Sequence, residues 1–140
     1  MSTETLLCVK NLEVTFALRS GDFQAVKGVS FELNKGERLG LVGESGAGKS
    51  ITGFSIINLI SAPGRISGGS VLFEGQDLAR LSPEKMRSIR GDRVAMIFQD
   101  PMMTLNPVLT VGQQMIETVR AHMDVRSEEH TSELQSHSDL

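Results

Sequence analysis

The stretch Gly43-Glu-Ser-Gly-Ala-Gly-Lys-Ser50 decides how this chain folds. It satisfies the pattern G-x-x-x-x-G-K-[ST] without a mismatch. Glycines suit a phosphate because they let successive backbone N–H groups turn toward one point and permit a close approach that a Cβ would prevent. A helix beginning near Gly48 would direct the positive end of its dipole at the same oxygens. The stretch therefore predicts a phosphate-binding loop.

The last two residues of this loop have separate predicted roles. Lys49 supplies a positive charge for the β- and γ-phosphates, and the Ser50 hydroxyl can bind Mg²⁺. The apolar run Arg38–Val42 before the loop predicts a strand buried on both faces, and residues 49–60 predict an apolar helix. This order of strand, loop and helix supports nucleotide binding. The motif alone leaves open a GTPase, a nucleotide kinase, a helicase or a transporter ATPase.

On the N-terminal side, the sequence predicts an antiparallel β element. Residues 7–16 alternate apolar and polar side chains, and residues 25–33 predict a second strand. Ser20-Gly21-Asp22 between them predicts a turn. The fold class expected is α/β, a P-loop nucleotide-binding core with an N-terminal antiparallel β subdomain.

The C-terminal side predicts further strands and helices. Residues 70–73 and 93–98 are expected to be strands, and Ser82-Pro83-Glu84 has the residue types that begin a helix. Thr110 is expected to cap a last helix. The apolar side of that helix consists of Val111, Met115, Ile116, Val119 and Met123.

Composition limits the classes of function. The 140 residues fit one domain, and the single cysteine, Cys8, is consistent with a reducing compartment. We see no signal peptide and no apolar stretch of the roughly 18 residues that a membrane span requires. The net charge of −3 arises from residues 126–140, so residues 1–125 are neutral and do not indicate nucleic acid as a partner.

Several segments outside the loop resemble one family of P-loop proteins. Phe16 resembles the adenine-stacking aromatic residue of ABC ATPases, and Met96-Ile-Phe-Gln-Asp-Pro101 resembles their Q-loop. Leu105-Asn106-Pro107 and Val111-Gly-Gln-Gln114 resemble the importer subfamily for dipeptides, oligopeptides and nickel. The resemblance covers residues 7–125.

The resemblance implies roles for individual residues. Phe16 would stack on adenine, although a strand-end core residue is the alternative. Gln99 would reach Mg²⁺ and the attacking water while its loop contacts the permease, and the alternative is a surface glutamine. Lys49 and Gln99 are thus the candidate catalytic residues, and Ser50 and Gln99 the candidate metal ligands. The candidate nucleotide contacts are Phe16, Gly43, Glu44, Ser45, Gly46, Ala47, Gly48, Lys49, Ser50 and Ile51.

For the parent protein, the resemblance implies ATP and Mg²⁺ as cofactors and ATP hydrolysis that drives import. Its expected partners are ABC permease subunits, a second ATP-binding subunit and, indirectly, a periplasmic substrate-binding protein. The expected location is peripheral, on the cytoplasmic side of the inner membrane. Two alternatives stay open: a non-transport ABC ATPase acting on DNA or ribosomes, and a nucleotide-binding fragment that does not hydrolyse ATP.

The remaining motifs of the family are not found in this sequence. It has no Leu-Ser-Gly-Gly-Gln signature, no apolar strand ending in Asp-Glu and no later switch histidine. Residues 126–140 resemble a translated sequencing adapter, with a natural disordered tail as the alternative. We therefore expect residues 1–125 to be the N-terminal part of an ABC ATP-binding domain, truncated before its signature motif. Such a fragment is expected not to turn over ATP efficiently, because residues that position the attacking water are missing.

Overall fold

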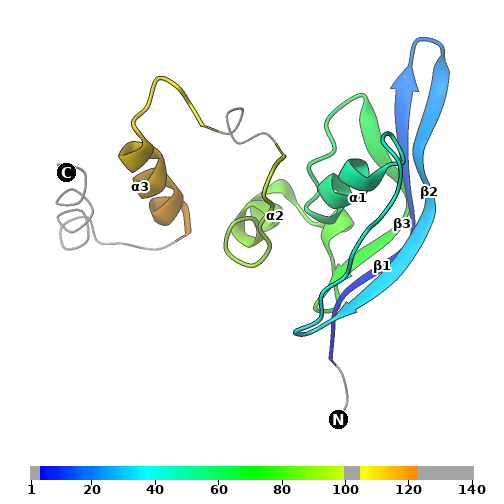
Figure 1. The fold of residues 1–140 in the computed structure, drawn as a ribbon, viewed down its shortest axis with the longest axis horizontal. Helices are drawn as coiled ribbons and strands as arrows, with labels where there is room; N and C mark the ends of the chain where they lie inside the picture. The colour runs from blue at the N-terminus through cyan, green and yellow to red at the C-terminus, as the bar shows by residue number, and fades with distance from the viewer. Residues whose placement is uncertain (1–3, 100–104, 123–140) are drawn as a thin grey trace. The chain divides into compact units, whose positions relative to one another are not determined.

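The computed structural model describes residues 4–99 and 105–122 (Figure 1). The chain divides into two compact units, Met1–Arg87 and Ser88–Leu140. Expectations for residues 100–104 and 123–140, including Met123 and the boundary after residue 125, lie outside the described residues.

A four-stranded antiparallel sheet forms the frame of the first unit. Strands β1 (Thr5–Leu18) and β2 (Gly21–Asn34) form a hairpin, in which Leu18 pairs with Gly21. Strand β3 (Gly64–Phe73) pairs with the other edge of β1, and β4 (Gln76–Asp77) follows it, so the strand order is β2-β1-β3-β4 (Figure 1). The predicted N-terminal antiparallel element is confirmed, and β1 is its central strand.

The core of this unit lies along β1 and the elements that cover it. Leu12 and Val14 of β1 are completely buried, as is Val71 of β3. The helical elements contribute Leu78 from the 3₁₀ helix η1 (Leu78–Arg80) and Met86 from α2 (Pro83–Ile89). Cys8 is also buried, and its Sγ lies 3.3 Å from Oε1 of Glu32. Cys8 is thus a small buried residue of this core.

The helix after the glycine-rich loop is shorter than predicted. Helix α1 spans Lys49–Ile56, whereas the sequence predicted a helix to residue 60. Asn58 adopts the left-handed conformation with φ of 50°, and its N–H donates to the Ser55 carbonyl. The N–H of Leu59 donates to the Phe54 carbonyl, which completes a Schellman ending. Asparagine tolerates this conformation better than most residues do, so it stops the helix.

The predicted strand over residues 38–42 is wrong. This segment has no regular structure and belongs to no strand of the described sheet. Leu39 and Leu41 are about half exposed, at 49% and 48%, and Val42 is 94% exposed. A β-strand requires a neighbouring backbone for its N–H and C=O groups, and the described residues provide none here.

The predicted strand over residues 93–98 in the second unit is also wrong. It forms only an isolated bridge between Arg90 and Val94, and Ile97 is 97% exposed. The same physical reason applies, because an apolar run becomes a strand only where another strand lies beside it.

A hydrogen-bonded turn leads into the last helix, α3 (Val111–His122). The Gln113 N–H donates to Thr110 Oγ1 at 3.3 Å, and the Thr110 N–H donates to Gln113 Oε1 at 3.0 Å, so the expected cap is confirmed. The Gln114 amide accepts from the Asn106 N–H and donates to the Asn106 and Leu109 carbonyls. The Asn106-Pro107 and Gln113-Gln114 segments noted in the sequence are therefore connected by hydrogen bonds within one turn.

The same helix presents an exposed apolar side: Val111, Met115 and Val119 are 59%, 54% and 37% exposed. None of the helices in the part of the chain that the structure describes is long and apolar enough to cross a membrane.

Candidate functional site

The glycine-rich loop lies against β2 and continues directly into α1. Gly48 is the N-cap of α1, and its φ of 82° is one that L side chains rarely adopt. A Cβ on Gly48 would also lie 2.8 Å from the Ala25 carbonyl oxygen of β2. Gly46 has φ of 80° but open space around it. Gly48 is therefore required for conformation and for space, whereas Gly46 is required for conformation alone.

The Lys49 side chain folds back over the loop. Its ammonium group donates to the Gly43 carbonyl at 2.7 Å and to the Glu44 carbonyl at 2.6 Å. An ammonium group has three N–H donors, so one remains for an anion held by the loop. The positive charge of Lys49 thus lies at the loop carbonyls, and its role toward phosphates stays a prediction.

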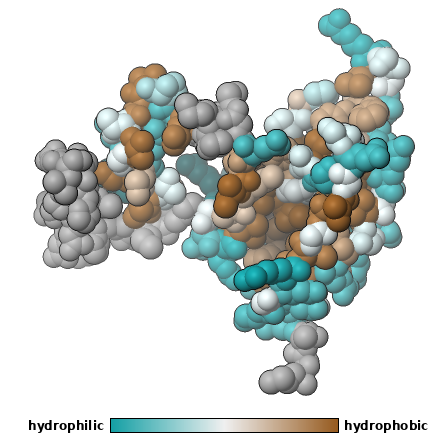
Figure 2. Space-filling model, viewed as in Figure 1, coloured by the Kyte–Doolittle hydropathy of each residue, from teal (hydrophilic) through white to brown (hydrophobic). Residues whose placement is uncertain are grey.

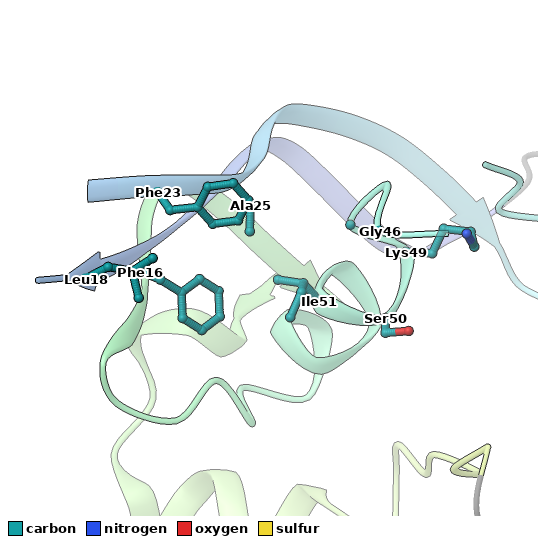
Figure 3. Close-up of a pocket in the computed structure, with 9 residues that line it drawn as sticks. Phe16, Leu18, Phe23, Ala25, Gly46, Lys49, Ser50 and Ile51 are labelled. Atoms are coloured by element: carbon teal, nitrogen blue, oxygen red, sulfur yellow. The ribbon is translucent and has the colours of Figure 1, made fainter. Parts of the chain in front are cut away.

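A pocket of about 380 Å³ joins this loop to the hairpin (Figure 3). One end is apolar and comes from β1 and β2, and the other consists of loop and helix residues. Figure 3 shows the rings of Phe16 and Phe23 on the same side, with Ile51 of α1 facing them. The lining residues are Phe16, Leu18, Phe23, Ala25, Gly46, Gly48, Lys49, Ser50 and Ile51. The pocket therefore contains Phe16 and five of the loop and helix residues that the sequence predicted as nucleotide contacts.

Phe16 has features of both roles that the sequence allowed for it, which are stacking on adenine and packing in the core. Its ring borders the pocket, yet it also packs against Gly64 of β3, where a Cβ would lie 2.6 Å from the ring. The side chain is half-buried. The ring is therefore held from one side by the sheet and is accessible from the pocket on the other.

The remaining loop residues lie outside this pocket lining. Gly43, Glu44, Ser45 and Ala47 are exposed, and the Ala47 N–H donates to the Glu44 carbonyl at 3.1 Å. The loop rim is therefore open to solvent, and its donors for an anion are backbone N–H groups and the Ser45 hydroxyl.

The donor set near Ser50 suits Mg²⁺ only in combination with a phosphate. The Ser50 hydroxyl is an oxygen ligand of the kind Mg²⁺ accepts, and the residue is exposed at the pocket. Among residues 4–99 and 105–122, no group of His, Cys, Asp and Glu side chains is large enough to hold a metal by itself. Mg²⁺ commonly binds through few protein ligands plus phosphate oxygens and water, so these residues fit that mode.

Gln99 is exposed and belongs to the second unit, whereas the pocket belongs to the first. The predicted role of Gln99 toward Mg²⁺ and the attacking water therefore stays a prediction.

Sequence reasoning missed three pocket residues, which are Leu18, Phe23 and Ala25. The missing information was the hairpin register, in which Phe16 and Phe23 are opposite each other across β1 and β2. Directly opposite residues of an antiparallel pair point to the same face, so the aromatic residue on β1 identifies a partner on β2 once the register is known.

Known proteins are similar to this chain in sequence over most of its length. The chain is 51% identical over 120 residues to the dipeptide transport ATP-binding protein DppD of Bacillus subtilis, which is 85% of this chain and 36% of that protein. It is 48% identical over 124 residues to the oligopeptide transport ATP-binding protein OppD of Bacillus subtilis, covering 88% of this chain and 35% of OppD. For OppD of Escherichia coli the identity is 44% over 126 residues, with 90% and 37% covered.

The chain thus spans little more than a third of the length of these relatives. The family model described as ABC transporter matches residues 26–139, which include the whole glycine-rich loop and α1. By this match the chain belongs to the ABC transporter family.

Proposed function

We propose that this chain binds ATP in the pocket between the hairpin and the glycine-rich loop. One observation carries the proposal: a single pocket is lined at one end by aromatic and aliphatic side chains and at the other by Lys49, Ser50 and loop glycines. ATP has the same division, with an apolar base and a highly charged triphosphate. Membership of the ABC transporter family supports this assignment.

Each group of the site has a definite part in this proposal. The loop N–H groups and the N-terminus of α1 bind the phosphate oxygens, and Lys49 supplies the positive charge beside them. Ser50 contributes its hydroxyl to Mg²⁺, which when bound neutralises charge on the phosphates. Gln99 is assigned to the metal and the attacking water.

In a longer protein, we assign this chain to the import of dipeptides or oligopeptides (or nickel), driven by ATP hydrolysis. Two of the relatives are named for dipeptide and oligopeptide transport, which supports the substrate class. Such an assembly would pair this chain with permease subunits in the membrane, with a second ATP-binding subunit and, indirectly, with a periplasmic substrate-binding protein. The chain itself would lie on the cytoplasmic face of the inner membrane.

Residues 1–125 would be the N-terminal part of the ATP-binding domain, and residues 126–140 a non-native tail. Binding without efficient hydrolysis is then expected for this chain, because the signature and Asp-Glu segments are not in the sequence. Steady ATP hydrolysis by the purified chain that disappears in Lys49→Ala would contradict that expectation.

Titration of the purified chain with ATP, with and without Mg²⁺, tests the proposed binding. We expect saturable binding that Lys49→Ala weakens at least about tenfold, since a charge-assisted contact to phosphate is removed. Ser50→Ala should weaken binding mainly when Mg²⁺ is present. Lys35→Ala is the matched control, because Lys35 is an exposed lysine paired with Glu4 away from the pocket. Equal affinity of the Lys49→Ala variant and the unaltered chain would refute the site.

A further inference from the structure

We propose that Phe23 is a second base-contacting residue of the nucleotide pocket and that it forms one apolar wall with Phe16. This inference rests on the proposed function, because it assigns the ligand base to a particular wall of the same pocket. The sequence indicated Phe16 alone, so Phe23 is an additional determinant of affinity and specificity.

The hairpin register brings the two rings together. Phe16 of β1 pairs directly with Phe23 of β2, and directly opposite residues of an antiparallel pair project from the same face. Both residues line the pocket, and Figure 3 shows both rings toward the space in front of Ile51. The two aromatic rings therefore both border the end of the pocket away from Lys49 (Figure 3).

Phe23 offers the more open of the two aromatic surfaces. The Phe16 ring is half-buried and rests against Gly64, whereas Phe23 is 56% exposed. Exposed aromatic area is unfavourable in water and is the surface on which a planar base gains contact energy by stacking. A base that enters the pocket would thus cover more new area on Phe23 than on Phe16.

The composition of this wall also bears on specificity. The side chains at the hairpin end of the pocket, from Phe16, Leu18, Phe23 and Ala25, contain no hydrogen-bonding atom, and neither does Ile51 of α1 facing them. Sites that bind by apolar contact discriminate weakly between ligands that differ in polar groups, whereas sites with fitted hydrogen-bond partners discriminate strongly. The wall therefore accepts a purine base by shape and stacking, and adenine and guanine nucleotides should bind with affinities within about tenfold of each other.

A comparison of ATP with inorganic tripolyphosphate, which lacks a base, distinguishes a base contact at Phe23 from phosphate binding at the loop. In the 140-residue chain, Phe23→Ala should weaken ATP about tenfold, which is within the range for loss of one base–aromatic contact. It should leave tripolyphosphate affinity unchanged within about twofold, since the loop is not altered. Phe23→Tyr should retain ATP affinity because it keeps the ring.

Gln24→Ala is the matched control, because Gln24 is the next residue of β2 and does not line this pocket. It should leave the affinity for both ligands unchanged, and thermal unfolding should show that all variants are folded. If Phe23→Ala retains full ATP affinity while Lys49→Ala loses it, the inference fails and the proposed function stands. Equal weakening of ATP and tripolyphosphate by Phe23→Ala would also refute the inference. If the unaltered chain binds neither ligand, the proposed function itself is wrong.

Discussion

Two segments that the sequence predicts to be strands have opposite outcomes in the first unit. Strand β1 has a hydrogen-bonded neighbour on each side, whereas the segment over residues 38–42 has none among the described residues. Leu12 of β1 is completely buried, and Val42 is 94% exposed. Figure 2 shows that hydrophobic side chains gather on the face of this unit that carries α1. The difference shows that an apolar segment has only a tendency to form a strand. Whether the strand forms depends on a neighbouring strand that pairs with its backbone.

Amide hydrogen exchange should show the largest contrast between these segments. Amides in β1 exchange only when the sheet opens, whereas amides of residues 38–42 have no described backbone partner. We expect exchange in residues 38–42 to be faster than in β1 by about a thousandfold or more, measured by mass spectrometry or NMR. Protection of residues 38–42 comparable to that of β1 would show that they are paired in solution, and the comparison would then break down.

Truncation of a leucine in each segment should give the next largest contrast. Leu12→Ala should lower the free energy of unfolding by about 3 kcal/mol, because it leaves a cavity at a completely buried position. Leu41→Ala should change it by less than about 0.5 kcal/mol, since Leu41 is 48% exposed. Urea denaturation followed by circular dichroism measures both values. A loss at Leu41 as large as that at Leu12 would indicate that residues 38–42 are packed.

Substitution of one glycine by alanine in each of two regions, which adds a single methyl group, tests the same difference in packing. Neither Gly64 nor Gly40 has a left-handed φ, but a Cβ on Gly64 would lie 2.6 Å from the Phe16 ring, and one on Gly40 would meet nothing within 4 Å. Gly64→Ala should destabilise the chain by about 1–3 kcal/mol through overpacking and should weaken ATP binding by displacing Phe16. Gly40→Ala should be neutral or stabilise by up to about 1 kcal/mol. Denaturation midpoints and ATP titration test both variants, and similar losses in the two would contradict the packing seen at Gly64.

The smallest expected effect concerns the pH dependence of the free energy of unfolding. Burial raises the pKa of the Cys8 thiol above its ordinary value of 9.0, and the hydrogen bond to Glu32 adds to the rise. The folded state therefore retains the thiol proton where the unfolded chain releases it, so stability falls as the pH rises above about 9. Unfolding free energies measured from pH 7 to pH 10 should decline less steeply in Cys8→Ala. An identical decline in both proteins would show that Cys8 does not contribute.

Local patterns predicted much of the molecule correctly. The hairpin, the caps of α2 and α3, and the position of Lys49 at the glycine-rich loop depend on contacts between residues close in the chain. The pattern for residues 49–60 predicted the helix but not its end, because no apolar periodicity reveals the left-handed Asn58. The Phe16–Phe23 pairing was missed because it depends on the hairpin register, which the alternation of apolar residues alone does not specify.

The sequence by itself determined the conformation of the glycine-rich loop, because Gly46 and Gly48 permit its positive φ values and Lys49 reaches the Gly43 and Glu44 carbonyls from close by in the chain. It also determined the two-stranded hairpin, through alternation on both sides of a turn. Only the tertiary structure decided which apolar runs became strands, since that depends on whether another backbone lies beside them. It alone also placed Phe23 beside Phe16 and Gly64 behind the ring, because side chains distant in sequence meet only after the strands are in register.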